Sequence, residues 1–410
     1  MASSSEVSAR RRERAGFWLY AASVVSIFGL ALSNVLLGLT LLSLPWTRRR
    51  PVPWGKLTPL WVFLGLYVLL YAGAILASYE LETSARGATE VFTLSSLFIA
   101  PLLLRRERQV RQVVDALLAV AALLACQGLS QYLLGFGDID HRIRGPFSTY
   151  MTFSGFLLIC DLLLIASLVY ARGRPGLWRN LWRWGALLVI NAALLGSYTR
   201  NAWVGLAVAL VALALLRAPR LLLAFVPAAL VFVILAPVPL LHRVTSILNL
   251  RDVSNYDRLC MLEAGMTMVR ERPIFGIGPD VVRHRYALYR PPVAPRYDVP
   301  HLHNSLLQLA AERGLPALAA YLGLNLAAMS LAWRRFRDEG GHRGPRADLY
   351  AGALLALLAF NVAGLFENNW GDAEVQRTAL FALAIPFCLA AAEQDRGEHG
   401  DEERPRTGDI

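Results

Sequence analysis

The 410-residue sequence has few charged side chains and almost no lysine. Charged residues make up 17% of the chain, and Lys56 is its single lysine. Hydrophobic residues make up 56%, and the mean hydropathy is +0.43. A soluble domain of this length cannot bury so large an apolar fraction, so the composition excludes one and predicts an all-α integral membrane protein. Because arginine replaces lysine almost everywhere, the position of an arginine is more informative than its identity.

Cysteine is scarce too, and the four cysteines are Cys126, Cys160, Cys260 and Cys388. Three of them lie inside apolar segments, and no two have the spacing of a metal site. The sequence therefore predicts neither a disulfide nor a zinc site. The basic segment 1–16 is not followed by a small-residue cleavage site, so we expect it to be an uncleaved cytoplasmic N-terminus.

Apolar segments of spanning or nearly spanning length predict the transmembrane helices. Beyond the first region there are ten, near 58–78, 91–104, 113–134, 150–170, 184–198, 202–216, 221–240, 315–333, 349–366 and 379–392. The first region, 17–45, would be about 43 Å long as one helix, against a hydrocarbon core of about 30 Å. Arginine clusters flank it on both sides, and the positive-inside rule places both in the cytoplasm. We therefore expect a hairpin of two short helices broken near Ser33 and Asn34, and about twelve transmembrane helices in total.

This topology places both termini and the short basic loops in the cytoplasm, and one large hydrophilic loop outside. Residues 17–240 would hold helices 1 to 9, 241–303 the outer loop, and 304–392 helices 10 to 12. The segment 393–410 has no apolar periodicity and is predicted to be a disordered cytoplasmic tail. The outer loop holds nine arginines, a number compatible with translocation because long loops cross largely regardless of charge. They are Arg243, Arg251, Arg258, Arg270, Arg272, Arg283, Arg285, Arg290 and Arg296.

The outer loop has helical periodicity of its own. DVSNYDRLCMLEAGMTMVRERP predicts an amphipathic helix that ends at Pro273, with an apolar stripe of Leu259, Leu262, Met266 and Val269. We expect this stripe to pack against the ends of the membrane helices, with contact to lipid tails as the alternative. A short helix over DVVRHRYALY and an extended, proline-rich RPPVAPRYDVP follow.

Two kinds of polar residue predict the chemistry of the outer face. Arg200 lies in SYTRNAW between two apolar helices, where burial would require an anionic partner, although snorkelling to headgroups is an alternative. Most loop arginines would form weak surface pairs, and a minority could converge on a phosphate. His303 opens a membrane helix beside Asn304, and a neutral imidazole there could accept a proton from a sugar hydroxyl. The other outer histidines are His141, His242, His284 and His301.

The segment HNSLLQLAAERG, 303–314, resembles the signature of the O-antigen ligase and polymerase family. In that family a His followed by Asn, Ser or Arg precedes a glycine, with nine residues between. Three further segments agree in order and topology: RGPFSTYMTFSG at 144–155, SYTRNAW around Arg200, and YDRLCMLEAGMTMVRERPIFGIGP at 256–279. One departure is visible, because the family commonly has an aromatic residue shortly after the loop arginine, where this chain has Cys260, Met261 and Leu262.

The resemblance implies a GT-C-like, inverting, metal-independent glycosyltransferase without cofactor, whose site faces the periplasm from the bacterial inner membrane. Its partners would be an undecaprenyl-pyrophosphate-linked glycan donor, a lipid A core acceptor and membrane lipid, and no nucleic acid. His303 matches the catalytic histidine of the family, and Arg200 and Arg258 match the arginines that hold the pyrophosphate. Supporting roles would fall to Asn304, Arg142, Arg144, His301, Arg270 and Arg272.

Three alternatives stay open. An O-antigen polymerase would use the same donor but a second lipid-linked glycan as its acceptor. A protein O-oligosaccharyltransferase usually carries an added soluble region. A transporter of an anionic lipid-linked glycan would need ionisable residues near mid-membrane, where Asp161 is the clearest buried acid.

Overall fold

The computed structural model describes residues 4–47, 54–136, 142–170, 177–224 and 252–402, with single residues at 241, 245 and 249. These ranges are helical and contain no β-strand, so the predicted all-α class is confirmed. The long helices are α1 (Ser4–Val25), α2 (Leu30–Thr47), α3 (Trp54–Leu76), α5 (Thr89–Leu103), α6 (Glu107–Leu133), α7 (Tyr150–Val169), α8 (Leu177–Gly196), α9 (Arg200–Arg217), α12 (Val253–Glu271), α14 (Ser305–Asp338), α15 (Ala347–Gly364) and α16 (Ala373–Glu402). The short elements are α4 (Leu81–Arg86), α13 (Val282–Tyr289), η2 (Pro219–Ala224) and η4 (Gly341–Arg343).

Within the described ranges, seven helices are long and apolar enough to cross a membrane. They are Leu57–Leu76, Glu107–Leu133, Tyr150–Val169, Arg200–Arg217, Ser305–Asp338, Ala347–Gly364 and Ala373–Gln394. Shorter apolar helices cover Leu30–Trp46 and Leu181–Gly196. The predicted span 221–240 falls mainly outside the described residues, as do His141, His242, Arg243 and Arg251. A multi-pass membrane protein is therefore confirmed, and the total of twelve spans stays a prediction.

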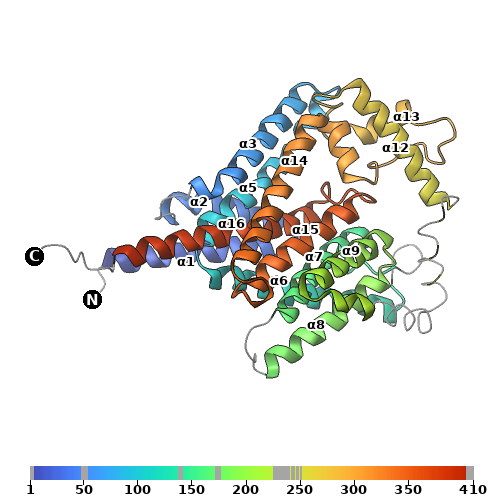
Figure 1. The fold of residues 1–410 in the computed structure, drawn as a ribbon. Coiled ribbons are helices and arrows are strands. Elements are labelled where there is room, and N and C mark those ends of the chain that lie inside the picture. Colours follow the sequence, from blue (N-terminus) through green and yellow to red (C-terminus); the bar gives the residue numbers. More distant parts are fainter. Residues whose placement is uncertain are drawn as a thin grey trace, which may run out of the picture.

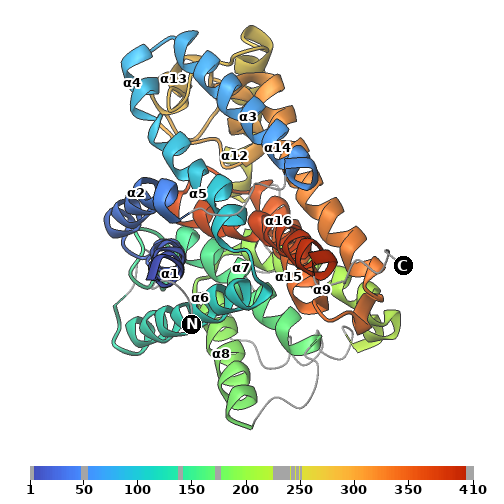
Figure 2. The same cartoon turned by 90° about the vertical axis from the view of Figure 1, so that its left-hand side faces the viewer.

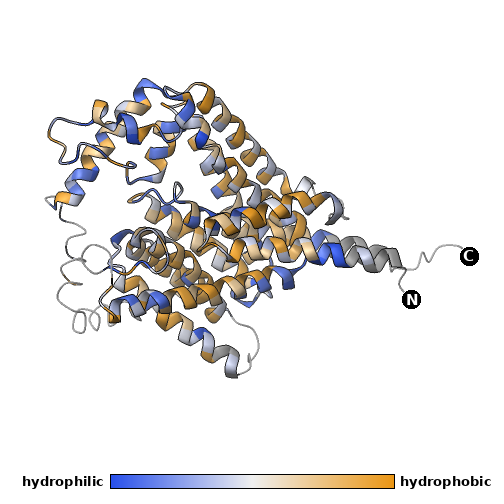
Figure 3. Ribbon diagram, turned by 180° about the vertical axis from the view of Figure 1, so that it is seen from behind, coloured by the Kyte–Doolittle hydropathy of each residue, from blue (hydrophilic) through white to orange (hydrophobic). Residues whose placement is uncertain are grey.

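Helices α7, α15 and α16 form the centre of the bundle. The apolar part of α16 is buried along its whole length, and α15 packs against both α7 and α9. Figures 1 and 2 both show α3 running beside α14 at the edge of this centre, where the two helices are in contact. Apolar residues cover most of the bundle, whereas hydrophilic residues gather along part of α12 and toward the end of α16 (Figure 3).

The first apolar region is a helical hairpin, as predicted, but its turn lies earlier than Ser33 and Asn34. Helix α1 ends at Val25 and α2 begins at Leu30, so the turn is formed by residues 26–29. Ser33 and Asn34 lie inside α2, where their side chains accept hydrogen bonds from the Arg377 guanidinium of α16. Ser33 and Asn34 therefore bind a neighbouring helix and do not mark a chain reversal.

Helix α16 continues to Glu402, into the segment 393–410 that was predicted to be disordered. Glu393 is paired with Arg335 at 3.0 Å and with Arg346 at 2.6 Å, which anchors the start of this extension. Residues 403–410 lie outside the described ranges. The start of α1 and the end of α16 lie on the side of the molecule opposite α12 and α13 (Figure 1).

The outer segment that follows α12 is bonded to a break in α14. At Gly314 the backbone has φ +82° and ψ 168°, a region that only glycine adopts readily. A Cβ at this position would lie 2.0 Å from the carbonyl oxygen of Ile274. The backbone N–H of Ile277 donates to the Ala311 carbonyl at 2.8 Å, and that of Leu315 donates to the Pro273 carbonyl at 2.8 Å. The glycine that ends the signature at 303–314 is therefore a docking point for the outer segment.

The amphipathic helix predicted in the outer loop is α12, but its buried face differs from the predicted stripe. Asp252 caps it by accepting hydrogen bonds from the backbone N–H groups of Ser254 and Asn255. The buried side chains are Asp257, Cys260, Met261, Ala264 and Met268, whereas Leu259, Leu262 and Met266 are exposed. Sequence periodicity could not distinguish these two faces, because both are apolar. The predicted short second helix is confirmed as α13.

Candidate functional site

Three residues predicted to form the site line one cavity of about 250 Å³. Arg200 is the first residue of α9, Arg258 lies in the second turn of α12, and His303 lies two residues before α14. The rest of the lining is mainly apolar and consists of Val204, Leu259, Leu262, Leu302, Leu307, Leu365 and Phe366, with Asn201, Asn255 and Asn304. Leu259 and Leu262 of the predicted apolar stripe therefore line this cavity. An apolar cavity with two guanidinium groups at its wall suits an amphiphile with an anionic head.

The two arginines differ in how they are paired. The Arg200 side chain is 11% exposed, and its Nη2 lies 3.6 Å from Asp252 Oδ1 and 3.4 Å from Ser254 Oγ. Arg258 is partly buried, and no described carboxylate forms an ion pair with it. Burial lowers the pKa of Arg258, the charge of Glu367 raises it, and the nearby Arg200 lowers it further, for a net lowering. A cation in this position is stabilised by an added anion.

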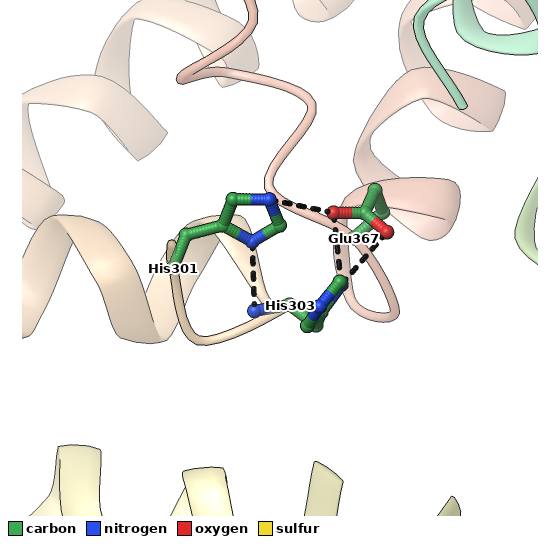
Figure 4. A group of neighbouring side chains, drawn as sticks. All are labelled: His301, His303 and Glu367. Atoms are coloured by element: carbon green, nitrogen blue, oxygen red, sulfur yellow. Dashed lines mark hydrogen bonds and ion pairs between the residues drawn. The ribbon is translucent and has the colours of Figure 1, made fainter. Parts of the chain in front are cut away.

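His303 is oriented by a buried carboxylate, Glu367 (Figure 4). Its Nδ1 lies 3.0 Å from Glu367 Oε1 and 2.9 Å from Oε2. An ionised carboxylate only accepts hydrogen bonds, so Nδ1 carries the ring proton and donates it to Glu367. In the neutral ring Nε2 then has a free lone pair on the side away from Glu367. This is the tautomer that a general base requires.

The charge state of the pair is set by its surroundings. The Glu367 side chain is 5% exposed. Burial raises its pKa, but the hydrogen bond from His303 and the charges of His303 and His301 outweigh burial and hold the pKa at about 2. Burial is the main reason that the pKa of His301 falls to about 4, and His303 and Arg258 add to this against the opposing charge of Glu367. Near neutral pH, Glu367 is therefore ionised and His301 is neutral.

His301 supports this arrangement from two residues upstream. Its Nδ1 accepts a hydrogen bond from the backbone N–H of His303 at 3.3 Å, so its own proton lies on Nε2. That Nε2 lies 3.5 Å from Glu367 Oε1, and the two imidazole rings are 4.4 Å apart in an edge-to-face arrangement. Together, His301, His303 and Glu367 place three atoms that can bind a metal within 4.8 Å of one another.

The signature residues after His303 hold the loop that carries Glu367. Asn304 caps α14 by accepting from the backbone N–H of Leu307, and its side-chain amide donates to the Leu365 carbonyl at 3.0 Å. Ser305 Oγ donates to the Glu367 carbonyl at 3.0 Å. Asn304 therefore helps to hold the loop that carries Glu367, and its supporting role in the reaction stays a prediction.

A buried polar network fixes the same loop from the other side. Trp370 Nε1 donates to Tyr67 Oη at 3.0 Å and to Glu90 Oε1 at 3.1 Å. Arg313 pairs with Glu90 at 2.5 Å and donates to Tyr67 Oη at 2.7 Å. The signature at 303–314 therefore contains His303 and also Arg313, which takes part in the network that holds the loop of Glu367.

The backbone is strained in two of the segments that carry the resemblance and directly after a third. Among the described residues, the non-glycine residues with positive φ are Tyr198 (51°), Asp280 (61°) and His303 (49°). Such conformations cost of order 1–3 kcal/mol and persist where the surrounding structure enforces them, often at functional sites. The surrounding structure therefore enforces the backbone conformation of Tyr198, two residues before Arg200, and of His303, the candidate base.

A second, more polar cavity of about 350 Å³ shares His303 and Arg258 with the first. Its other lining residues are Arg142, Tyr150, Met151, Ser254, Asp257 and Arg296. The Arg142 guanidinium lies over the Tyr150 ring at 4.5 Å, and Arg296 Nε lies 3.2 Å from Asp257 Oδ2. His303 therefore stands at the border between an apolar cavity and an arginine-lined polar one.

The remaining predicted supporting residues are not brought to these two cavities. Arg144 is exposed and donates to the Ser148 carbonyl at 3.0 Å. Arg272 lies over the Tyr79 ring at 4.3 Å, at the far end of α12, and Arg270 is two residues before it. Neither cavity is lined by any of the three. Their expected contact with substrate stays a prediction.

Glu367 is the candidate site residue that sequence reasoning missed. It lies 64 residues after His303, in the outer connection between α15 and α16. One signal was available, because FENNWGDAE places acids in a short outer loop between apolar helices. A histidine base is commonly oriented by a carboxylate, so these acids were candidates for that partner.

The fold and site together define a multi-pass helical membrane protein with a histidine–carboxylate pair beside two arginines. Residues 184–322 match the model of the O-antigen ligase family, and this third of the chain contains Arg200, Arg258 and His303. This segment is therefore similar to the O-antigen ligase family, in agreement with the resemblance found in the sequence. A search of curated proteins finds no match.

Proposed function

We propose that the chain is an O-antigen ligase of the bacterial inner membrane, with both termini in the cytoplasm and a GT-C-like architecture. It would transfer a glycan from undecaprenyl pyrophosphate to a hydroxyl of the lipid A core oligosaccharide, with inversion and without a metal, at the periplasmic face. The observation that carries this proposal is the position of His303. His303 lines both the apolar and the polar cavity, and Arg258 lines the same two cavities.

The apolar cavity suits the donor. Its leucines, valine and phenylalanine would contact the isoprenoid next to the headgroup, and Arg200 and Arg258 would contact the pyrophosphate. Negative charge grows on the leaving phosphate as the glycosidic bond breaks, and fixed guanidinium groups stabilise that charge. Because Arg258 has no described carboxylate partner, it is available for this contact without first breaking an ion pair.

His303 would act as the general base. The acceptor hydroxyl gives its proton to Nε2 as its oxygen forms a bond to the anomeric carbon, while the bond from that carbon to the pyrophosphate breaks. Attack from the face opposite the pyrophosphate inverts the anomeric configuration. The imidazolium that forms is stabilised by Glu367, and a positioned base contributes on the order of 10²–10⁴ in rate.

The polar cavity suits the acceptor. Arg142 and Arg296 line it together with the Tyr150 ring, a combination that fits sugars bearing phosphate or carboxylate groups. An acceptor bound there would place a hydroxyl beside His303 while the donor occupies the neighbouring cavity.

Two alternatives make different use of these cavities. A polymerase would place a second lipid-linked glycan in the polar cavity, and the family match includes both activities. A transporter would need no general base, whereas the hydrogen bond to Glu367 favours the tautomer of His303 that can act as a general base.

The identity of the product tests the proposal. Purified protein is given undecaprenyl-pyrophosphate glycan and lipid A core, and the products are separated by mass. A ligase yields glycan joined to lipid A core, in the presence or absence of a chelator. Lengthened lipid-linked glycan would establish a polymerase instead, and movement of intact donor across proteoliposomes without a new bond would establish a transporter.

A further inference from the structure

We propose that His301, His303 and Glu367 form a binding site for a borderline divalent cation, best represented by Zn²⁺, whose occupancy inhibits the enzyme. The inhibition rests on the proposed function, whereas the binding does not. The cysteine spacing gave no sign of such a site, because all its ligands are histidine and glutamate from two connections far apart in the sequence.

The distances from Glu367 to the two imidazoles are close to those in a metal site. In a tetrahedral zinc site, bonds of about 2.0–2.2 Å place neighbouring ligand atoms about 3.3 Å apart. His301 Nε2 lies 3.5 Å from Glu367 Oε1, and His303 Nδ1 lies 3.0 Å from that oxygen. The three atoms are within 4.8 Å of one another, so a modest turn of the His301 ring completes the set. Two imidazoles and a carboxylate are a frequent zinc ligand set, which leaves the fourth position open for water.

The surroundings favour a cation. Glu367 is 5% exposed and His303 is 11% exposed, so their ligand atoms are held in place by packing. His301 is 27% exposed and has more freedom to adjust. Ser305 Oγ donates to the backbone carbonyl of Glu367, and the backbone N–H of Asn368 donates to the carboxylate oxygen Oε1 at 3.0 Å, which restrains the carboxylate. Figure 4 shows both imidazoles approaching the same carboxylate.

A metal ion bound at this site would change the tautomer of His303, the proposed base. A neutral imidazole carries one proton on one of its two nitrogens. A metal bound to His303 Nδ1 takes the place of the hydrogen bond to Glu367, and the ring proton moves to Nε2. The nitrogen that faces the acceptor hydroxyl then has no lone pair. The same shift in His301 places a proton on Nδ1, which can no longer accept the hydrogen bond from the His303 backbone.

Direct metal binding is measured with the full-length purified protein in detergent, by titrating Co²⁺ and recording its visible absorption, and then displacing it with Zn²⁺. We expect one site with the intense bands of a four- or five-coordinate ion. His301→Ala should weaken binding by more than about 100-fold, because it removes a ligand and not merely a neighbour of one. Glu367→Gln provides a second variant in case His301→Ala does not fold.

The matched control is His284→Ala. His284 also has a carboxylate beside it, since its Nδ1 lies 2.7 Å from Glu80 Oε2, but no second histidine of the described ranges joins them in a metal-binding group. This variant should bind Co²⁺ as the wild type does. In the same preparations Zn²⁺ should abolish glycan transfer by the wild type, and a chelator should restore it.

Several results would overturn the proposal: no cobalt spectrum, a spectrum that persists in both His301→Ala and Glu367→Gln, loss of the spectrum in His284→Ala, or binding without inhibition. Failure of the proposed function is recognised separately, as the absence of transfer in metal-free wild-type protein, and the cobalt spectrum still tests the site in that case.

Discussion

Replacement of Glu367 by glutamine is expected to impair catalysis and to lower the free energy of unfolding. The substitution keeps the size of the side chain and removes its charge. The fall in the Glu367 pKa from 4.5 to about 2 corresponds to about 3 kcal/mol of favourable interaction with its surroundings. Because the folded-state pKa is depressed, this stabilisation is complete above pH 4.5 and is lost as the pH falls toward 2.

The loss of transfer rate is expected because the substitution can change the tautomer of His303. The glutamine oxygen can still accept from His303 Nδ1, but its NH₂ group can instead donate to Nδ1 and place the ring proton on Nε2. In Ser-His-Asp triads the corresponding exchange lowers turnover by about 10⁴, so we expect a loss of about 10²–10⁴ in transfer rate. Donor binding should change little, because Glu367 does not line the donor cavity.

The assay is steady-state transfer by purified protein at pH 7, with donor binding measured separately. Glu263→Gln is the matched control, because Glu263 is exposed on α12 and should be replaced without effect. A Glu367→Gln enzyme with turnover close to that of the wild type would refute the role assigned to the carboxylate.

Three further predictions follow from particular contacts. Gly314→Ala should lower the free energy of unfolding by about 3 kcal/mol or more, measured by thermal unfolding in detergent, because the backbone strain and the clash with Ile274 disrupt the docked outer segment. Gly65→Ala, where a Cβ meets open space, should be close to neutral, and equal effects of the two variants would contradict this reasoning. Arg258→Lys should weaken donor binding about 10-fold, as a paired donor becomes a point charge, and unchanged affinity would remove Arg258 from the donor site. Because the His301 pKa falls from 6.5 to about 4, unfolding should become easier by up to about 3 kcal/mol as the pH falls through that window, and His301→Asn should flatten this dependence in chemical unfolding.

Much of the fold and the centre of the site were predictable from the sequence because they depend on local patterns. Apolar segments of spanning length indicate membrane helices whatever their neighbours are. The cap at Asp252 and the proline at 273 bounded α12 within a few residues. Arg200, Arg258 and His303 were each identified within their own segment, and the structure brings them to one cavity.

The rest depends on contacts between distant segments. The hairpin turn was misplaced because Ser33 and Asn34 look like a break, although they bind Arg377 from more than 340 residues away. The exposed face of α12 was mistaken for its buried face, since the two faces are similarly apolar and the choice depends on the cluster formed with Ile277 and Tyr286. Glu367 was missed for the same reason, because only the folded chain places it against His303.

The most direct test is the rate of glycan transfer by His303→Ala, measured with purified protein alongside donor binding. Arg86→Ala serves as a control for surface mutation, because Arg86 is 76% exposed on α4. We expect transfer to fall by at least about 10²-fold in His303→Ala. Donor binding should be retained, and Arg86→Ala should behave as the wild type. Transfer by His303→Ala at a rate close to that of the wild type would contradict the assignment of His303 as the base.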